Sequence, residues 1–241
     1  MSRFFIFLFK YCILKKNEGA EVEKMAIREI LLDEYGYNEP IVTTNMSKQN
    51  FGLKPDSLRR NINRLVEKKE MARFCDGVYY FPKWNEMLQQ NTQVSERVVI
   101  ERKYIQDKTE RYGYFSGLAL ANELQLTTQV PAVLEIVTEN NASKKRTVML
   151  KNTPLTLKKA RVPITFENYK VLQVFDLLTD KVSYNEVPKE IMIDRLKAYL
   201  EDVTLSEAEI IEIIAKYPSK TSKELIETGL YHALIQGQRD V

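Results

Sequence analysis

The sequence predicts an α+β protein, in which an N-terminal winged helix-turn-helix precedes a mixed α/β domain and a helical C-terminal region. Two observations carry the N-terminal part: residues 55–69 have the apolar spacing of a helix, and a short hairpin pattern follows over residues 71–82. Beyond them, short apolar runs with strand character alternate with turns as far as residue 162, and helical periodicity returns from residue 188. The chain of 241 residues is long enough for two domains.

Three helices are expected in the N-terminal domain, residues 25–83. The first spans residues 25–37, because Gly36 and Pro40 end it, and the second follows a threonine cap and reaches residue 51. The third spans residues 55–69, where Pro55 suits the first helical turn because its missing N–H costs nothing there. Its apolar face carries Leu58, Ile62, Leu65 and Val66.

A hairpin is predicted directly after the third helix. Two apolar, aromatic-rich runs, residues 71–75 and 78–81, flank the dipeptide Asp76-Gly77. Such a dipeptide favours a type I′ turn, in which both central residues take positive φ. A helix followed by a basic hairpin is the order of a winged helix, and DNA binding is the expected function.

The polar side of the third helix supplies the candidate DNA contacts. Arginine suits guanine and asparagine suits adenine in the major groove, so the candidates for base edges are Ser57, Arg60, Asn61 and Arg64. Phosphate contacts are the commoner class, and they are expected from Thr44, Lys48, Lys68 and Arg73. The alternatives are a solvated helix face and a winged helix that binds protein rather than DNA.

A second basic region lies between residues 140 and 166, which hold no aspartate or glutamate. A segment without carboxylates in a chain with 33 acidic residues indicates a surface for a polyanion or for an acidic partner. A merely solvated face is the alternative. Its basic residues are Lys144, Lys145, Arg146, Lys151, Lys158, Lys159 and Arg161.

The composition argues against several kinds of enzyme. One histidine and two cysteines offer no metal-ligand pair or disulfide framework, so we expect no metal and a reducing, cytoplasmic compartment. No glycine-rich phosphate loop or Gly-Ser dipeptide of a nucleotidyltransferase occurs, and no cofactor is expected. The Glu-X-Lys patterns of a restriction-type nuclease, near residues 21–24 and 101–103, fall in predicted helices. The prediction is a protein that is not an enzyme.

The first 24 residues form an apolar extension, MSRFFIFLFKYCIL followed by charged residues. The apolar run is too short to span a bilayer and lacks a cleavage site. We expect a mis-assigned start before Met25, a dispensable segment, or an apolar helix packed on the body or on a second copy.

The remaining chain is expected to contain a linker helix over residues 84–111, a mixed α/β domain over 112–182 and a helical region over 183–241. In the mixed domain, Ser116 caps a short helix over residues 118–124, strands follow over 133–137, 147–150 and 155–162, and a helix lies over 170–178. The C-terminal helices are expected over residues 189–201, 206–217 and 222–236. Ser206 and Glu209 have the spacing of a capping box.

Two strings of this sequence resemble the antitoxin family of type IV toxin–antitoxin systems, the AbiE-type abortive-infection regulators. One is RLVEKKEMARFCDGVYYFP, in which the third helix runs into the hairpin, and the other is GYFSGLALANELQLTTQVP, from Gly113 to Pro131. The resemblance covers about residues 25–180.

The resemblance implies a bacterial transcriptional autoregulator that binds double-stranded DNA at its own promoter. It also implies a partner, a nucleotidyltransferase-like toxin encoded by the neighbouring gene, which the C-terminal domain counters. A homodimer is an open expectation, and no membrane association is expected.

Overall fold

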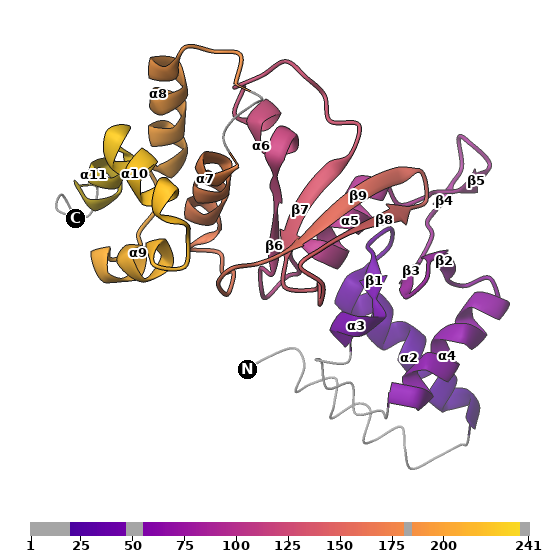
Figure 1. Ribbon diagram of the computed structural model, residues 1–241. Coiled ribbons are helices and arrows are strands. Elements are labelled where there is room, and N and C mark those ends of the chain that lie inside the picture. The colour runs from indigo at the N-terminus through magenta and orange to yellow at the C-terminus, as the bar shows by residue number, and fades with distance from the viewer. Residues whose placement is uncertain (1–19, 47–54, 181–184, 237–241) are drawn as a thin grey trace. The chain divides into compact units, whose positions relative to one another are not determined.

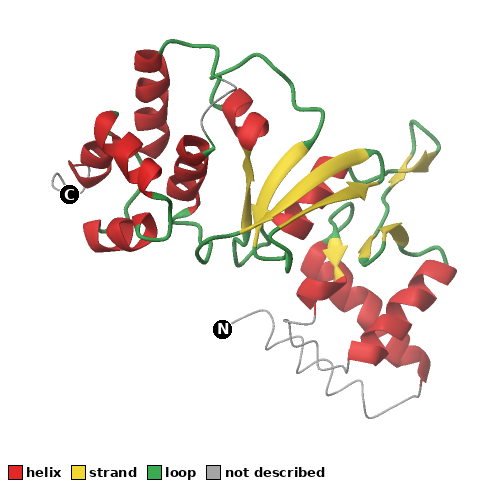
Figure 2. Cartoon of the chain, viewed as in Figure 1, coloured by secondary structure: helices red, strands yellow, loops and turns green. Residues whose placement is uncertain are grey.

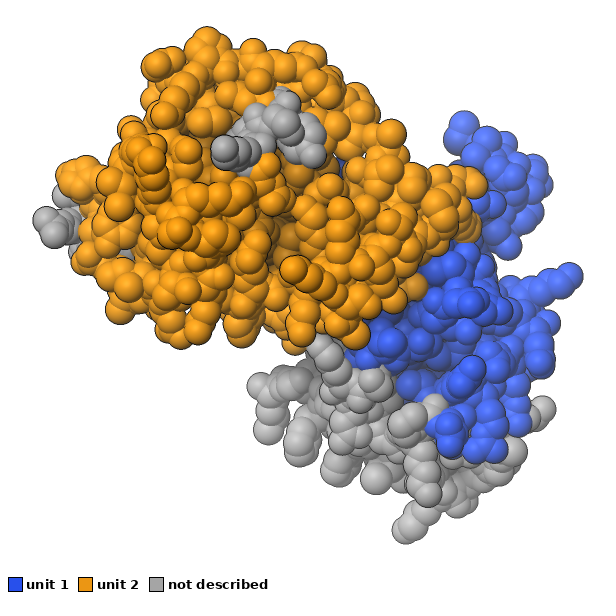
Figure 3. Space-filling view, in the orientation of Figure 1, with its two compact units in different colours: residues 1–99 blue, residues 100–241 orange. Residues whose placement is uncertain are grey.

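The computed structural model describes residues 20–46, 55–180 and 185–236 (Figure 1). The chain divides into two compact units, Met1–Val99 and Ile100–Val241 (Figure 3). The described residues form helices and three separate sheets (Figure 2), so the coarse prediction of a mixed α+β protein is confirmed. Within these ranges, no helix is long and apolar enough to cross a membrane.

The described part of the first unit starts with helix α2 (Ala20–Tyr35). It starts five residues before the predicted start at Met25. The helix ends at Tyr35, two residues before the predicted end, because Gly36 takes φ +84° and its N–H donates to Leu32 O at 2.8 Å. Strand β1 (Ile41–Val42) and helix α3 (Thr43–Met46) follow, and the rest of the expected second helix lies outside the described residues.

Helix α4 (Pro55–Glu67) corresponds to the predicted third helix and is two residues shorter. Lys69 takes φ +61°, and the N–H groups of Lys69 and Glu70 donate to Val66 O and Leu65 O, each at 2.9 Å. This pair of bonds is a Schellman motif, which satisfies the last helical carbonyls and turns the chain toward the hairpin. The apolar face of α4 belongs to one buried cluster with α2, comprising Ile27, Leu31, Ile41, Met46, Leu58, Ile62, Leu65, Met71 and Phe81.

The hairpin consists of β2 (Ala72–Cys75) and β3 (Val78–Tyr80), and β3 also pairs with β1, all antiparallel. The prediction of a type I′ turn is wrong. Only Gly77 takes positive φ, at +74°, and the register shifts between Arg73 and Cys75. The irregularity in β2 therefore supplies the strand twist that a turn with two left-handed residues would otherwise supply.

The predicted linker helix over residues 84–111 is also wrong. The chain instead forms a second hairpin of β4 (Trp84–Asn85) and β5 (Gln90–Asn91), and only Glu96–Tyr104 is helical, as α5. Asn85 Oδ1 accepts a hydrogen bond from Leu88 N at 3.0 Å, an Asx-type turn that competes with helix formation. Gln89 takes φ +49°, which closes the turn.

The second unit contains a four-stranded sheet of β6 (Gly113–Ser116), β7 (Leu134–Thr138), β8 (Lys145–Leu150) and β9 (Thr153–Lys159). The strand order is β6-β7-β9-β8, with β7 and β9 parallel and the other pairs antiparallel. Strand β6 was not predicted. It runs directly into the expected short helix, α6 (Gly117–Glu123), although the Ser116 side chain makes no capping bond.

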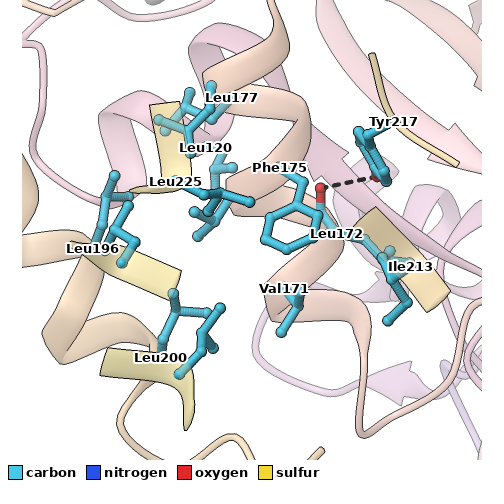
Figure 4. Packing of buried hydrophobic residues seen from close by; sticks show 14 of the residues in the cluster. Leu120, Val171, Leu172, Phe175, Leu177, Leu196, Leu200, Ile213, Tyr217 and Leu225 are labelled. Atoms are coloured by element: carbon cyan, nitrogen blue, oxygen red, sulfur yellow. Dashed lines mark hydrogen bonds between the residues drawn. The ribbon is translucent and has the colours of Figure 1, made fainter. Parts of the chain in front are cut away.

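Helix α7 (Tyr169–Thr179) forms the centre of the second unit, and its residues from Val171 to Thr179 are all buried. It packs on β6 and on α6, α8 and α10. The ring of Phe175 meets that of Tyr217 edge-on, with centroids 5.4 Å apart. The Tyr217 hydroxyl donates to Leu172 O at 3.5 Å, a hydrogen bond drawn as a dashed line in Figure 4.

The C-terminal region is helical, as predicted, with α8 (Lys189–Leu200), α9 (Glu207–Ile214), α10 (Ser219–Glu227) and α11 (Leu230–Gln236). The capping box of Ser206 and Glu209 at the start of α9 is confirmed. The single helix expected over residues 222–236 is divided, because Gly229 takes φ +69° between α10 and α11.

Candidate nucleic-acid interface

One face of α4 is fixed against the core of the first unit, and this orients the remaining faces toward solvent. Leu58, Ile62 and Leu65 are buried, at most 8% exposed. Residues three and four positions apart share a helix face, so the polar residues of the sequence prediction gather away from this anchor. Arg60, Arg64 and Lys68 are exposed and Ser57 and Asn61 are half-buried.

The two arginines on this face have no carboxylate partner within the described ranges. Arg60 Nε donates to Asp56 O at 3.3 Å, one turn back along the helix, and Arg64 lies one turn further on. Both guanidinium groups keep donors for a ligand, and an arginine fork suits the paired acceptors of guanine or phosphate.

A hollow of about 490 Å³ separates the N-terminal half of α4 from the hairpin. Arg59 and Arg73 contribute its cations, Asp56 and Asp76 its carboxylates, and the full lining is Thr43, Asp56, Leu58, Arg59, Ile62, Arg73, Asp76, Gly77 and Tyr79. Arg59 was missed by the sequence prediction. Arg59 lies three residues before the buried Ile62, and this spacing places it at the edge of the buried face of α4. There it lines the hollow next to the hairpin, which Arg60 does not line.

The tip of the hairpin is held by the start of α3. Thr43 N and Thr43 Oγ1 both donate to Gly77 O, at 2.9 and 3.2 Å. Within the hairpin, Arg73 donates to the carboxylate of Asp76, so the predicted phosphate contact is engaged in a local ion pair. Thr44 is exposed on α3, and Lys48 lies outside the described residues.

The other end of the hairpin is joined to α2. Arg28 Nε lies 3.0 Å from Glu70 Oε2, and its guanidinium carbon lies 6.0 Å from the centre of the Phe81 ring. This arginine links α2, the turn after α4 and the end of the hairpin. Such a contact is structural, because it holds the elements that orient the exposed face of α4.

In the second unit, the acid-free segment 140–166 forms β8, β9 and the turns around them, and the structure divides its seven basic residues. Lys158 Nζ lies 2.7 Å from Glu135 Oε2 and 3.0 Å from Asp180 Oδ2. Burial lowers the pKa of Lys158, but the hydrogen bonds to both carboxylates outweigh burial and the pKa is raised. Arg161 lies 3.6 Å from Asp176 Oδ1 and over the Tyr217 ring.

The other five basic residues are exposed. Strand β8 is at the end of the strand order, and Lys145 on β8 is directly opposite Lys158 on β9. Lys159 N donates to Lys144 O at 3.1 Å, which brings the two ends of the hairpin together. We call this exposed set the basic strand surface; it consists of Lys144, Lys145, Arg146, Lys151 and Lys159.

A buried polar pair lies next to Arg161. The Tyr114 hydroxyl donates to Asp176 Oδ2 at 2.8 Å, and both side chains are buried. Burial raises the pKa of Asp176, and the bond from Tyr114 and the charge of Arg161 reduce that rise. Among the described residues, no group of three or more histidine, cysteine, aspartate or glutamate side chains could hold a metal ion. The pair is a core feature that joins β6 to α7.

The string from Gly113 to Pro131 forms β6, α6 and a loop fastened by Glu186. The Glu186 carboxylate accepts from Thr128 N at 2.8 Å, from Thr128 Oγ1 at 3.0 Å and from Gln129 Nε2 at 2.8 Å. These bonds, led by the one from the Thr128 backbone, lower the pKa of Glu186 to about 2. The polar residues Thr128 and Gln129 therefore belong to an ordered loop held by Glu186.

Residues 47–200 match a family of unknown function, DUF6088, and the chain belongs to this family. The match takes in α4 and its hairpin, the four-stranded sheet and helix α7, and it ends at the last residue of α8. No curated protein matches the chain.

Proposed function

We propose that the chain is a bacterial DNA-binding transcriptional regulator, in which the first unit is a winged helix. The observation that carries this proposal is the exposed guanidinium groups of Arg60 and Arg64, which have no carboxylate partner among the described residues, on a helix whose opposite face is anchored in the core. A helix docked in the major groove presents such a face to base edges, and the hairpin beside it contacts the backbone. No catalytic step is assigned to the chain.

In this proposal the residues of the first unit have different tasks. Arg60 and Arg64 read guanine, while Asn61 reads adenine and Ser57 contacts either kind of base edge. Lys68, Arg73, Thr44 and Lys48 bind phosphates, and Arg59 joins them from the flank facing the hairpin.

The second part of the proposal is that this regulator is the antitoxin of a type IV toxin–antitoxin system, a cytoplasmic abortive-infection protein that represses its own promoter. It rests on the resemblance of the two sequence strings to AbiE-type antitoxins. The partner is then a nucleotidyltransferase-like toxin, and the basic strand surface is the candidate region for countering it. Five exposed cations suit either an acidic face of the toxin or the nucleic acid that the toxin modifies.

A binding titration of the full chain against a duplex from upstream of its own gene tests the DNA-binding part. Cognate affinity should fall steeply with salt, because phosphate contacts release counterions. The double variant Arg60→Ala/Arg64→Ala should lose about 2–6 kcal/mol at the cognate duplex, at about 1–3 kcal/mol for each arginine. Its matched control is Lys216→Ala/Lys220→Ala, which removes two exposed cations from the second unit. Equal affinities of the double variant and the wild type would reject the assignment of α4.

A further inference from the structure

The hairpin of β4 and β5 is a projecting element with a firm base; we call residues 83–92 the arm. Thr92 N donates to Lys83 O at 2.8 Å and Lys83 N donates to Thr92 Oγ1 at 3.1 Å, which closes the base. The Thr92 hydroxyl also donates to Asn38 Oδ1 at 2.6 Å, which ties the base to the turn after α2. The arm is therefore fixed at its base, and its tip lies at the opposite end from the hydrogen bond between Thr92 and Asn38.

The tip of the arm is apolar and exposed. Met87 is 95% exposed and Leu88 is 63% exposed, while Trp84, 53% exposed, lies near the base at the start of β4. Two bonds shape the turn that presents Met87 and Leu88, from Leu88 N to Asn85 Oδ1 at 3.0 Å and from Gln89 Nε2 to Glu86 O at 2.6 Å. Exposed apolar side chains grouped on an ordered turn indicate a contact with another molecule.

The base of the arm lies at the C-terminal end of α4. A hollow of about 320 Å³ is lined jointly by the end of α4, the hairpin and the arm, through Val66, Lys69, Met71, Ala72, Tyr80, Pro82, Asn91, Thr92 and Gln93. The polar face of α4 thus ends beside the arm, with the exposed cations Lys68, Lys69 and Lys83 around the junction. These three cations suit the phosphate backbone that separates two DNA grooves.

We propose that the arm enters the minor groove of the DNA and inserts Met87 and Leu88 at a base step. This inference rests on the proposed DNA binding by α4, from whose end the arm extends. Met and Leu are among the apolar side chains that proteins use as wedges in the minor groove, and Asn and Gln are among those that read its edge. The arm supplies both kinds, with its amides on Asn85, Gln89, Gln90 and Asn91. Four to five extended residues span roughly 15 Å, enough to cross one backbone.

A second copy of the chain is a poorer occupant than DNA. A stable protein interface buries about 800 Å² on each partner, whereas the arm offers three apolar side chains on strands of two residues each. Its other exposed side chains are mainly amides, which suit a wet, narrow groove lined with acceptors. Glu86 is the single carboxylate in residues 83–92, so the arm adds little repulsion toward phosphate.

The test compares the full chain with the double variant Met87→Ser/Leu88→Ser on the upstream duplex. The matched control is Ile211→Ser/Ile226→Ser, which removes two exposed apolar side chains, 51% and 69% exposed, from α9 and α10. We expect the arm variant to bind about tenfold more weakly, because the cost of unstacking a base step offsets much of what the contacts with the bent duplex contribute. The wild type and the control should bend the duplex, measured by energy transfer between its ends, and the arm variant should not.

A 2-aminopurine scan of the same duplex locates the wedge. One step should become strongly fluorescent with the wild type and remain quenched with the arm variant. Wild-type binding with no such step, or equal bending by both proteins, would overturn the arm proposal and leave DNA binding by α4 intact. Loss of dimer in the arm variant, seen by sedimentation with DNA affinity unchanged, would assign the arm to a second copy. A wild type that binds no DNA at all would reject both proposals.

Discussion

Lys158 on β9 and Glu135 on the neighbouring parallel strand β7 form an ion pair, with Nζ and Oε2 2.7 Å apart. Both side chains are 24% exposed, and Asp180 at the end of α7 completes the contact. Because Lys158 already has two carboxylate partners, it holds the sheet to α7 and is not available to a partner molecule. The acid-free segment therefore contains a structural cation as well as the basic strand surface.

Charge reversal of the basic strand surface should abolish protection against the partner toxin. We expect the variant Lys144→Glu/Lys145→Glu/Arg146→Glu/Lys159→Glu to fold with an unchanged thermal midpoint, because exposed charges contribute little to stability. Colony survival on co-expression of the toxin should be lost, while repression of a promoter reporter should remain.

Lys158→Glu tests the structural role of Lys158. The new carboxylate would lie beside those of Glu135 and Asp180 in a half-buried place, and this should lower the free energy of unfolding by about 2 kcal/mol, measured with denaturant. Full protection by the fourfold variant would exclude the basic strand surface as the antitoxin region.

Arg73 and Asp76 offer a second prediction, because their ion pair lies on the hairpin expected to contact phosphate. Asp76→Asn should free the guanidinium and remove a repulsive charge, so it should strengthen binding to cognate and random duplexes alike by roughly 1 kcal/mol or less. Arg73→Ala should weaken binding to both and flatten the salt dependence. A change confined to the cognate duplex would mean that Arg73 reads a base.

The sequence predicts best where one face of an element is decided by local spacing. The buried residues of α4 and the capping box before α9 follow from periodicity and chemistry within four residues. The arm was missed because residues 84–111 carry charged residues with intermittent apolar ones, which also suits a helix. The base of the arm is held by a hydrogen bond between Thr92 and Asn38, which are far apart in the chain.

The candidate site shows the same division between local and distant causes. The side of α4 that carries Arg60 and Arg64 could be assigned from the sequence, whereas the neighbourhood of Arg59 and Arg73 depends on how the hairpin folds back. No spacing rule separates Lys158 from Lys145, since only the distant Glu135 and Asp180 distinguish them. Strand β6 was not predicted from the sequence, because only three residues separate Gly113 from Gly117 and so short a run shows no strand pattern.

Gly113 provides a stability prediction for the sheet. A Cβ at this position would lie 2.0 Å from Tyr104 O and 2.9 Å from Val137 O, and both are backbone atoms that cannot move aside cheaply. Gly113→Ala should cost about 3 kcal/mol in unfolding free energy. The control Gly36→Ala has φ +84° but no atom within 4 Å, so it should cost only about 1–2 kcal/mol from the left-handed backbone. Equal losses in the two variants would show that the close approach of β6 and α5 is not rigid.

Asp176 gives a prediction about pH. Burial raises the pKa of its carboxyl above that of the unfolded chain. An acid with a raised pKa stabilises the fold fully below the unfolded pKa, near 4, and loses that stabilisation as pH rises through the folded pKa. The stability of the wild type relative to Asp176→Asn should therefore decrease between pH 4 and pH 7, measured by urea unfolding. Tyr114→Phe should enlarge the decrease, because it removes a hydrogen bond that favours the ionised form. A pH-independent difference between wild type and Asp176→Asn would contradict the raised pKa.

The last prediction concerns the independence of the two units. The first unit has a core cluster that lies entirely before residue 82, and its DNA-facing candidates, the arm included, are all on residues 44–92. A fragment of residues 1–95 ends before α5 and keeps the arm with Thr92 at its base, whereas a cut at residue 90 would remove half of the arm. We expect this fragment to fold cooperatively and to bind the upstream duplex, more weakly if the second unit supplies a dimer contact. It should not protect cells from the partner toxin, because β8 and β9 are absent. Repression by the fragment without survival would establish two separable activities, and survival with the fragment would reject the division of labour.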